Sequence, residues 1–302
     1  MTTIDDYQIG RYLGRGKYGL VYLARENKSG LVVALKVLYK QFILKERCEG
    51  QLRRELEIHT NLRHPNITRL YTWFQDATRI FLVLEYCSGG ELYSYLTQFT
   101  RLPVRVVSKI THDVLAALQF AHKKSILHRD IKLENVLCSY SPELIESLKL
   151  KLSTNSLTDS QGPETPENLL QFTFKLSDFG WSVHHPGVAQ KSVFNQSRRK
   201  TQCGTLDYLP PQLVLGQPYH SGCDIWSLGV MCYELLAGQP PFYHETLETT
   251  KANIAAVKFS YPEGMPDVAK DFIKKCLVKD QDKRATADEL TKHQFVKLWE
   301  SQ

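Results

Sequence analysis

The stretch HRDIKLENVL, His128 to Leu137, decides how the rest of the chain is interpreted. Asp130 can accept the proton of a hydroxyl group, and two positions later Lys132 can neutralise charge on a phosphoryl group during its transfer. Three positions further on, the amide of Asn135 can bind a magnesium ion. A basic surface turn is the alternative, because His, Arg, Asp and Lys are common on protein surfaces. The spacing favours phosphoryl transfer over that alternative.

Glycines recur upstream in LGRGKYGLVYLAR, where Gly14, Gly16 and Gly19 are followed by Val21. Glycine lets a backbone come close to nucleotide phosphates in a conformation that other residues resist, with its N–H groups facing the anion. An ordinary hairpin turn shows the same pattern, so the glycines alone are weak evidence. The next element strengthens them, because the β-branched run VVALK predicts a strand ending in Lys36, which can reach the α- and β-phosphates.

Two acidic residues complete the pattern. Glu55, nineteen positions after Lys36, is a candidate partner for that lysine and lies in QLRRELEIHTNL. One face of an amphipathic helix is predicted there by Leu52, Leu56 and, less regularly, His59 and Leu62. Downstream, the segment KLSDFG supplies Asp178 and Phe179.

These five motifs, in this order, resemble those of the eukaryotic protein kinases, and the resemblance covers nearly the whole chain. It implies that Lys36 pairs with Glu55 only when the helix, called αC in that family, swings inward. It also implies that Asp178 binds magnesium and that the packing of Phe179 accompanies the active arrangement. The cofactors implied are ATP and Mg²⁺.

The fold implied by the resemblance is α+β, the two-lobed protein kinase fold. Residues 1–86 would form a small N-lobe with an antiparallel sheet and the αC helix, and residues 87–302 a larger, mainly helical C-lobe. The single catalytic domain would span about 7–296. With 302 residues, 42% of them apolar and 23% charged, the chain can bury the core that this fold needs. Strands are predicted over 7–14, 19–25, 31–38, 68–75 and 80–86, and further helices over 91–98, 103–123, 223–237, 245–255, 266–277 and 286–290.

The segment FLVLEYCSGG resembles the hinge between kinase lobes, with Leu84 as the gatekeeper and backbone groups of Glu85 and Cys87 available to the adenine. Plain core packing is the default interpretation for the apolar residues expected around the ring. The ATP-binding set implied by the resemblance is Leu13, Gly14, Gly16, Lys17, Gly19, Val21, Ala34, Lys36, Leu84, Glu85, Cys87, Glu134, Asn135, Leu137 and Asp178.

A narrower resemblance appears in the segment that follows. DFGWSVH and CGTLDYLPP, together with LRREL, LRHPNI and LEYC upstream, are similar to the Aurora family of serine/threonine kinases. Thr205 of CGT would hydrogen-bond to Asp130 and Lys132 and fix the base while a substrate hydroxyl docks. The same resemblance makes Thr201 the activation phosphosite. Its phosphate would bind Arg54 and Arg129, although a solvated loop threonine is the alternative.

Acidic positions indicate the substrate. Glu91, Glu134 and Glu234 match places where basophilic kinases hold arginines upstream of the acceptor residue, although each alone could be a surface charge. The expected protein substrate carries arginine two or three residues before Ser or Thr. Arg198 and Arg199 precede the activation threonine in this way, so trans-autophosphorylation in a transient dimer of an otherwise monomeric protein is expected.

Three departures from the family pattern stand out. Gln212 replaces the usual glutamate of PPE, so a hydrogen bond to Arg284 is expected in place of an ion pair, with weaker anchoring of the loop. Leu133 replaces a usual proline, which should leave the base untouched. His59 stands where Auroras carry glutamine, which predicts a contact with Phe179 that is sensitive to pH near neutrality.

Composition sets limits on compartment and partners. The seven cysteines show no CxxC pairs or metal-ligand spacing, which favours reduced thiols in the cytoplasm or nucleus. A net charge of +6 is mild, and the clearest basic cluster, Arg198-Arg199-Lys200, is explained by the predicted activation threonine that follows it, so direct nucleic-acid binding is not expected. The absence of a signal peptide or long apolar run argues against membranes. An insertion over about 139–171, rich in Ser, Thr, Pro and Glu, is expected to be disordered, and the segment 184–197 is also longer than usual.

The Aurora resemblance further implies an activator peptide of the inner-centromere or spindle-targeting kind on the N-lobe, where Tyr71, Trp73 and Phe74 are candidate contacts. It implies localisation to the spindle, to centrosomes or basal-body-type microtubule structures, or to chromosomes, by family alone. Two alternatives stay open. One is a pseudokinase scaffold that binds partners without catalysis, and the other is a basophilic kinase of the cyclic-nucleotide-dependent group.

Overall fold

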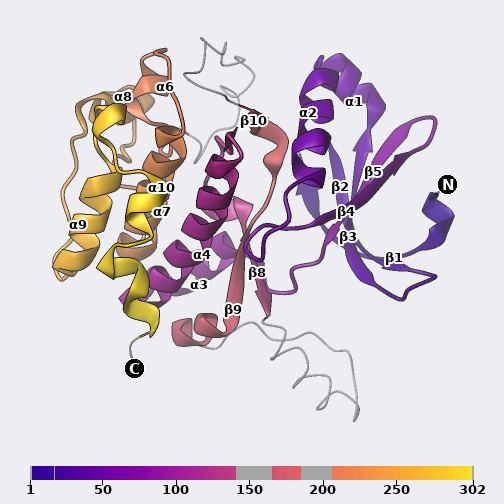
Figure 1. The fold of residues 1–302 in the computed structure, drawn as a ribbon, viewed down its shortest axis with the longest axis horizontal. Coiled ribbons are helices and arrows are strands. Elements are labelled where there is room, and N and C mark those ends of the chain that lie inside the picture. Colours follow the sequence, from indigo (N-terminus) through magenta and orange to yellow (C-terminus); the bar gives the residue numbers. More distant parts are fainter. Residues whose placement is uncertain (1, 17, 141–164, 185–205, 301–302) are drawn as a thin grey trace.

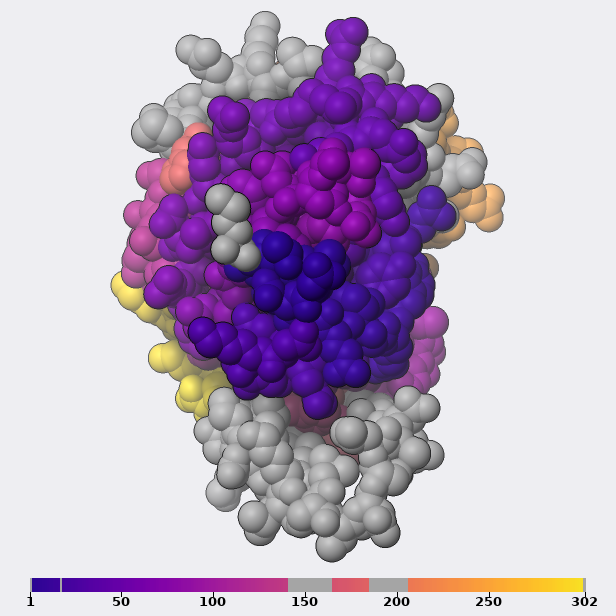
Figure 2. Space-filling view, turned by 90° about the vertical axis from the view of Figure 1, so that its right-hand side faces the viewer, coloured from indigo at the N-terminus to yellow at the C-terminus, as the bar shows by residue number. Residues whose placement is uncertain are grey.

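Alternating apolar residues build a five-stranded antiparallel sheet at one end of the molecule (Figure 1). The computed structural model describes residues 2–16, 18–140, 165–184 and 206–300. The sheet order is β1-β2-β3-β5-β4, and Figure 2 shows this end of the molecule, with the earliest strands in indigo near its centre. The strands are β1 (Tyr7–Gly16), β2 (Gly19–Glu26), β3 (Val32–Tyr39), β4 (Leu70–Gln75) and β5 (Arg79–Glu85).

The two faces of this sheet serve different purposes because side chains alternate along a strand. Val33, Leu35 and Val37 of β3 join an apolar cluster on one face. Lys36 and Leu38 project to the other face, which α1 (Lys40–Lys45) and α2 (Glu49–Thr60) cover. The short helix α1 was not predicted from the sequence.

Helix α2 connects the sheet to the rest of the molecule through two sets of apolar residues. Leu52 and Leu56 pack against the cluster under the sheet. Ile58 and the following Leu62 belong instead to the large core of the helical part. A displacement of α2 would therefore disturb contacts on both sides.

Within the described residues, seven helices form the second, larger part around that core: α3 (Leu92–Phe99), α4 (Val104–Lys123), α6 (Pro211–Val214), α7 (Gly222–Ala237), α8 (Leu247–Ala256), α9 (Asp267–Cys276) and α10 (Ala287–Leu290). Helix α7 is buried from residue 222 to residue 236. Helix α4 packs beside it and contributes Ile110, Val114 and Leu118 to the same core. None of the helices in the described part of the chain is long and apolar enough to cross a membrane.

Short strands and 3-10 helices complete the described structure. The strands are β6 (Gly90–Glu91), β7 (Ile126–Leu127), β8 (Val136–Tyr140), β9 (Phe172–Leu176) and β10 (Val183–His184), which pair as β6-β8-β9 and β7-β10. The 3-10 turns are η1 (Ile4–Asp6), η2 (Leu133–Asn135), η3 (Pro166–Gln171), η4 (Phe179–Trp181), η6 (Gln281–Lys283) and η7 (Gln294–Glu300). Among these elements, β6, η2 and β8 hold predicted site residues.

The architecture confirms the predicted α+β kinase fold, with a small antiparallel sheet beside a larger helical part. The division between lobes at residues 86 and 87 stays a prediction. The expectation of disorder throughout 139–171 is wrong at both ends of that range. Residues 139 and 140 extend β8, and η3 is ordered because Leu169 is fully buried and packs into the large core. Residues 141–164 lie outside the described part.

Candidate active site

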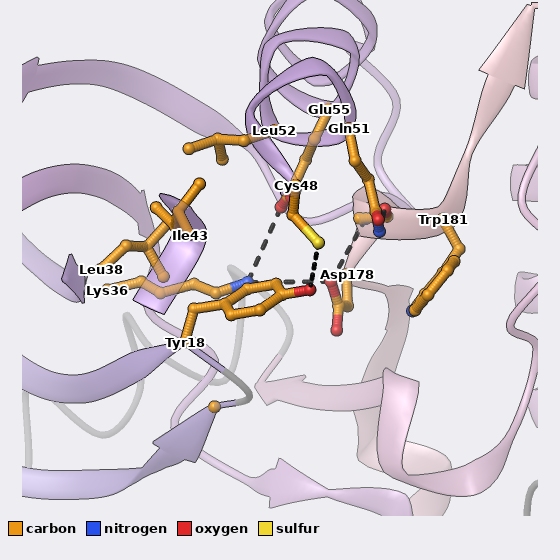
Figure 3. Close-up of a pocket in the computed structure, with 12 residues that line it drawn as sticks. Tyr18, Lys36, Leu38, Ile43, Cys48, Gln51, Leu52, Glu55, Asp178 and Trp181 are labelled. Atoms are coloured by element: carbon orange, nitrogen blue, oxygen red, sulfur yellow. Dashed lines mark hydrogen bonds and ion pairs between the residues drawn. The ribbon is translucent and has the colours of Figure 1, made fainter. Parts of the chain in front are cut away.

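Lys36, Glu55 and Asp178 come from three separate elements and meet in one place (Figure 3). The Lys36 Nζ atom lies 3.7 Å from Glu55 Oε1 and 3.7 Å from Asp178 Oδ1. Strand β3 supplies the lysine, α2 supplies the glutamate, and the segment before η4 supplies the aspartate. The structure therefore brings together three residues that the sequence analysis had grouped by motif.

The three charged groups of this trio shift one another's pKa values. Burial alone would lower the pKa of Lys36, but the carboxylates of Asp178 and Glu55 outweigh burial and raise it. The Lys36 ammonium in turn holds the pKa of Asp178 below its ordinary value. Burial raises the pKa of Glu55 against the opposing charge of Lys36. At neutral pH the site therefore offers a fixed cation beside an ionised carboxylate, a combination suited to a phosphate and its metal ion.

The predicted catalytic loop is compact. Asp130 Oδ2 lies 3.4 Å from Lys132 Nζ and accepts a hydrogen bond of 3.0 Å from Asn135 Nδ2. The same amide nitrogen donates to the Asp130 carbonyl oxygen at 2.7 Å. Proton acceptor, cation and amide thus lie in one turn, with Asp130 nearly buried at 8% exposure.

The residues predicted as metal ligands, Asn135 and Asp178, fit a magnesium ion in their chemistry. Both hydrogen bonds of the Asn135 side chain run from its nitrogen, and its Oδ1 has no hydrogen-bond donor among the described residues. The Asp178 side chain is 43% exposed. An amide oxygen and a carboxylate are the hard ligands that Mg²⁺ prefers.

Asp224 anchors the catalytic loop, and the sequence analysis missed it. Its carboxylate accepts hydrogen bonds from the backbone N–H groups of His128 at 2.9 Å and Arg129 at 2.7 Å, and from His122 Nε2 at 2.9 Å. Arg129 has a φ of 66°, a left-handed conformation that this carboxylate helps to hold. The available signal was a carboxylate in the first turn of α7, a helix whose sequence is mostly apolar.

Phe179 lies buried between two histidine rings. Its ring centroid is 4.9 Å from that of His59 on α2 and 4.9 Å from that of His128. His59 Nε2 donates to the Thr68 carbonyl oxygen at 2.6 Å, and burial lowers the pKa of His59 to about 4. The contact between His59 and Phe179 is as predicted, but the predicted sensitivity near neutral pH is wrong, because the ring is already uncharged there.

The four residues predicted to enclose the adenine, Leu13, Val21, Ala34 and Leu137, are all half-buried. By contrast, the residues on either side of Ala34 in the strand are fully buried. Ala34 pairs in register with the predicted gatekeeper Leu84, so both belong to the face of the sheet that carries Lys36. This pattern favours an open apolar surface over plain core packing.

At the hinge, the Glu85 N–H donates to the Arg69 carbonyl oxygen at 2.8 Å, so this N–H is not available to a nucleotide. Among the predicted glycines, residue 19 has a second reason to lack a side chain. A Cβ there would lie 1.7 Å from the Val37 carbonyl oxygen, whereas residues 14 and 16 have more space. Lys17 lies outside the described residues.

The charge of Glu134 acts on both Glu91 and Glu234. Burial raises the pKa of Glu91, and the neighbouring charge of Glu134 raises it further. Burial also raises the pKa of Glu234 to about 7, with a smaller contribution from Glu134. The Tyr208 hydroxyl donates a hydrogen bond to Glu234, a contact that was not predicted. The three glutamates therefore form one acidic cluster that a cation would stabilise.

The proposed phosphate-binding arginines come from two segments that contact η4. Arg129 Nε donates to the Trp181 carbonyl oxygen at 2.6 Å, and its Nη1 donates to the Tyr219 hydroxyl at 2.7 Å. Arg54 is exposed on α2, the helix that contacts η4. Thr201 and Thr205 lie outside the described residues.

The predicted hydrogen bond between Gln212 and Arg284 is confirmed. Arg284 Nη2 donates to Gln212 Oε1 at 3.2 Å, and both residues are buried. The glutamine also donates from Nε2 to the Lys279 carbonyl oxygen at 2.7 Å. Arg284 is further satisfied by the carbonyl oxygens of Gly222 and Val278.

Comparison with known proteins identifies the family of this chain. The protein kinase domain family matches residues 7–296. The chain is 43% identical over 295 residues to Aurora kinase C of Mus musculus, covering 98% of this chain and 93% of that protein. It is 41% identical over 295 residues to Aurora kinase B of Danio rerio, covering 98% and 80%. It is 40% identical over 294 residues to Aurora/IPL1-related protein kinase 2 of Caenorhabditis elegans, covering 97% and 84%. The chain therefore belongs to the protein kinase family and, within it, to the Aurora serine/threonine kinases.

Proposed function

We propose that this kinase transfers the γ-phosphoryl group of ATP, bound with Mg²⁺, to serine or threonine residues preceded by arginine. Membership of the protein kinase family establishes the use of ATP and a divalent metal ion and the action on proteins. The convergence of Lys36, Glu55 and Asp178, with distances of 3.7 Å to the lysine, is the observation that carries the proposal.

Each residue has a defined part in this proposal. Lys36 binds the α- and β-phosphates, and Glu55 holds the lysine in place. Asp130 accepts the proton of the substrate hydroxyl, and Lys132 stabilises the charge on the phosphoryl group. Asn135 and Asp178 would hold Mg²⁺, which when bound supplies positive charge to the phosphates. The proposed part of Thr205, which lies outside the described residues, is to fix the base.

The acidic cluster of Glu91, Glu134 and Glu234 supports a preference for arginine. Arginine binds carboxylates in a bidentate way. Burial, and to a smaller extent the charge of Glu134, raises the pKa of Glu91 and Glu234, and an arginine cation would favour the ionised forms of both. A protein substrate with arginine two or three residues before the acceptor would place its cations against this cluster.

Activation by phosphorylation at Thr201 is the second part of the proposal. Arg129 belongs to the catalytic loop and Arg54 to α2, so a phosphate bound by both would tie the base and the nucleotide lysine to the same loop. The Arg-Arg-Lys sequence before Thr201 matches the proposed substrate preference, which supports trans-autophosphorylation in a transient dimer.

An activator peptide would bind the exposed side of β4. Tyr71 and Trp73 are 37% and 43% exposed there, whereas Phe74 is buried and stacks between Tyr7 and Phe81. Phe74 therefore belongs to the core and not to the activator surface. By the family alone, we propose a role in mitosis at the spindle, centrosomes or chromosomes.

One experiment tests the proposal. Wild type and Asp130→Asn would be incubated with labelled ATP and either an arginine-rich peptide or the same peptide with glutamine replacing arginine. We expect turnover by wild type only, preference for the arginine peptide, and phosphate at Thr201 by mass spectrometry. Nucleotide binding by wild type without turnover would instead favour the pseudokinase scaffold.

A further inference from the structure

Helix α2 reaches three different segments from one face. Cys48 at its N-cap, Gln51 and Glu55 are spaced three and four positions apart, a spacing that places side chains on the same side of a helix. Glu55 pairs with Lys36 of β3, and Gln51 Nε2 donates to the Gly180 carbonyl oxygen next to Asp178. The third contact, made by Cys48, reaches the glycine-rich turn between β1 and β2 (Figure 3).

Tyr18 is the residue of that turn which Cys48 contacts. The Tyr18 hydroxyl donates a hydrogen bond of 3.0 Å to Cys48 Sγ. Its ring is half-buried against Ile43 and Leu38, and its carbonyl oxygen accepts a hydrogen bond from the Tyr39 N–H. Burial raises the pKa of Tyr18, so the hydroxyl keeps its proton and remains a donor at physiological pH.

Cys48 is placed to receive this bond and not to cap its own helix. It occupies the N-cap position, but its side chain makes no capping hydrogen bond. Its Sγ donates instead to the Glu46 carbonyl oxygen at 3.2 Å, which leaves the sulfur lone pairs facing Tyr18. The Cys48 side chain therefore acts as an acceptor for the turn above the phosphate site.

We propose that Tyr18 and Cys48 are positioning residues that couple closure of the glycine-rich turn to the inward position of α2. Closure brings Tyr18 onto the N-terminus of the helix that carries Glu55, and the inward helix presents Cys48 to the turn. The inference rests on the proposed nucleotide site and adds to it a contact that favours ATP binding and the Lys36–Glu55 pair together.

A double-mutant cycle tests the coupling. Tyr18→Phe removes only the hydroxyl, and Cys48→Ala removes its acceptor. Each single variant should raise the KM for ATP roughly threefold to tenfold, while kcat at saturating ATP stays within about twofold of wild type. The double variant should resemble either single variant, because the bond is already lost after the first change. Tyr12→Phe, on the exposed part of the same hairpin, is the matched control and should leave the KM unchanged.

A second measurement does not depend on turnover. A small maleimide would alkylate Cys48 with and without a non-hydrolysable ATP analogue, and mass spectrometry would follow the modified peptide. The analogue should slow alkylation at least about threefold in wild type and less than about twofold in Tyr18→Phe, because the hydroxyl no longer holds the turn closed.

The outcomes separate this inference from the proposed function. Effects of the two variants that multiply in the double variant, or equal protection of Cys48 in wild type and Tyr18→Phe, would overturn the coupling while leaving the kinase proposal intact. Wild type that binds no nucleotide would overturn both.

Discussion

Helices α2 and α7 both position groups of the active site, but the structure holds them in opposite ways. α7 is buried from residue 222 to residue 236, and its Asp224 accepts hydrogen bonds from two backbone N–H groups and a histidine. In α2, Glu55, Ile58 and His59 are the buried residues, while the rest of the helix is partly or fully exposed. Its connection to the nucleotide lysine is an ion pair of 3.7 Å.

The difference shows that the loop held by α7 is the fixed part of the site and that the lysine contact made by α2 is the part that can be switched. The loop with the proposed catalytic base is hydrogen-bonded to the buried helix α7, so moving it would break buried hydrogen bonds to Asp224. The proposed nucleotide-binding residue Lys36 is held by an ion pair to α2, a helix that lies between two apolar clusters. Such contacts can be made and broken at low energy, which suits control by phosphorylation or by a bound peptide.

Asp224→Asn should have the largest effect, because it disturbs the fixed side. The amide would turn its NH₂ group toward at least one N–H that the carboxylate now accepts, leaving buried donors without partners. We expect a loss of about 3–5 kcal/mol in the free energy of unfolding, measured with urea. Asp288→Asn, at an exposed aspartate of α10, is the control and should change stability by less than about 0.5 kcal/mol. Equal effects of the two variants would contradict the anchoring role of Asp224.

His59→Gln examines the buried side of α2. In the folded protein the His59 pKa is lowered to about 4 from an ordinary value of 6.5, so folding favours the neutral ring. This contribution to stability is complete above pH 6.5 and is lost as the pH falls toward 4. Wild type should therefore lose about 3 kcal/mol more than His59→Gln between pH 7.5 and pH 4. Parallel curves of unfolding free energy against pH would show that His59 is not the group responsible.

Glu55→Gln should affect activity more than stability, the reverse of Asp224→Asn. The glutamine keeps the size of the side chain but no longer neutralises Lys36, so the lysine is held less firmly for the phosphates. We expect kcat/KM for ATP to fall about tenfold to a hundredfold, with the free energy of unfolding changed by less than about 1 kcal/mol. Glu57→Gln, on the exposed side of the same helix, should leave both unchanged. A large loss of stability with intact kinetics would place α2 in the fixed part of the molecule.

The sequence predicted the helices and strands that have a strong hydrophobic periodicity and clear boundary residues. The helix expected over 103–123 is found at Val104–Lys123, and the strand expected over 31–38 at Val32–Tyr39. Helix α1, KQFILK, was missed because it has six residues directly after a strand and no side-chain cap. Helix α1 is stabilised because Ile43 packs under the sheet, a tertiary contact that the local sequence pattern does not predict.

The contacts of the candidate site likewise divide into those that the sequence predicted and those that it did not. Residues within contiguous motifs, such as Asp130 with Asn135, were predicted together because their spacing is local. The contacts of Tyr18 with Cys48, of Gln51 with Gly180 and of His128 with Asp224 join residues 30, 129 and 96 positions apart. They were missed because no recognised motif linked these residues, whereas the family resemblance linked Lys36 with Asp178 and Gln212 with Arg284. For His59 the position was predicted but its protonation was not, because the cost of burying a charge depends on surroundings that only the fold supplies.

Gln212→Glu should have the smallest effect on the free energy of unfolding. It tests how firmly the segment around Gln212 is held next to α7. Restoring the carboxylate usual in the family would add an ion pair with Arg284, which Gln212 now contacts at 3.2 Å. It would also remove the Nε2 donor that binds the Lys279 carbonyl oxygen at 2.7 Å and place a negative oxygen against that carbonyl. The gain and the loss act on the same buried pair, so we expect the free energy of unfolding to change by less than about 1 kcal/mol.

Gln212→Ala is the matched variant, because it removes both contacts without adding a charge. It should cost about 1–3 kcal/mol, since the Arg284 guanidinium and the Lys279 carbonyl each lose a buried partner. Urea unfolding of both variants beside wild type measures the difference. A gain of several kcal/mol in Gln212→Glu would mean that the glutamine leaves Arg284 poorly compensated. A negligible change in the free energy of unfolding of Gln212→Ala would mean that the carbonyl groups of Gly222 and Val278 already satisfy Arg284. The α7 side of the site would then keep its rigidity without the family's ion pair.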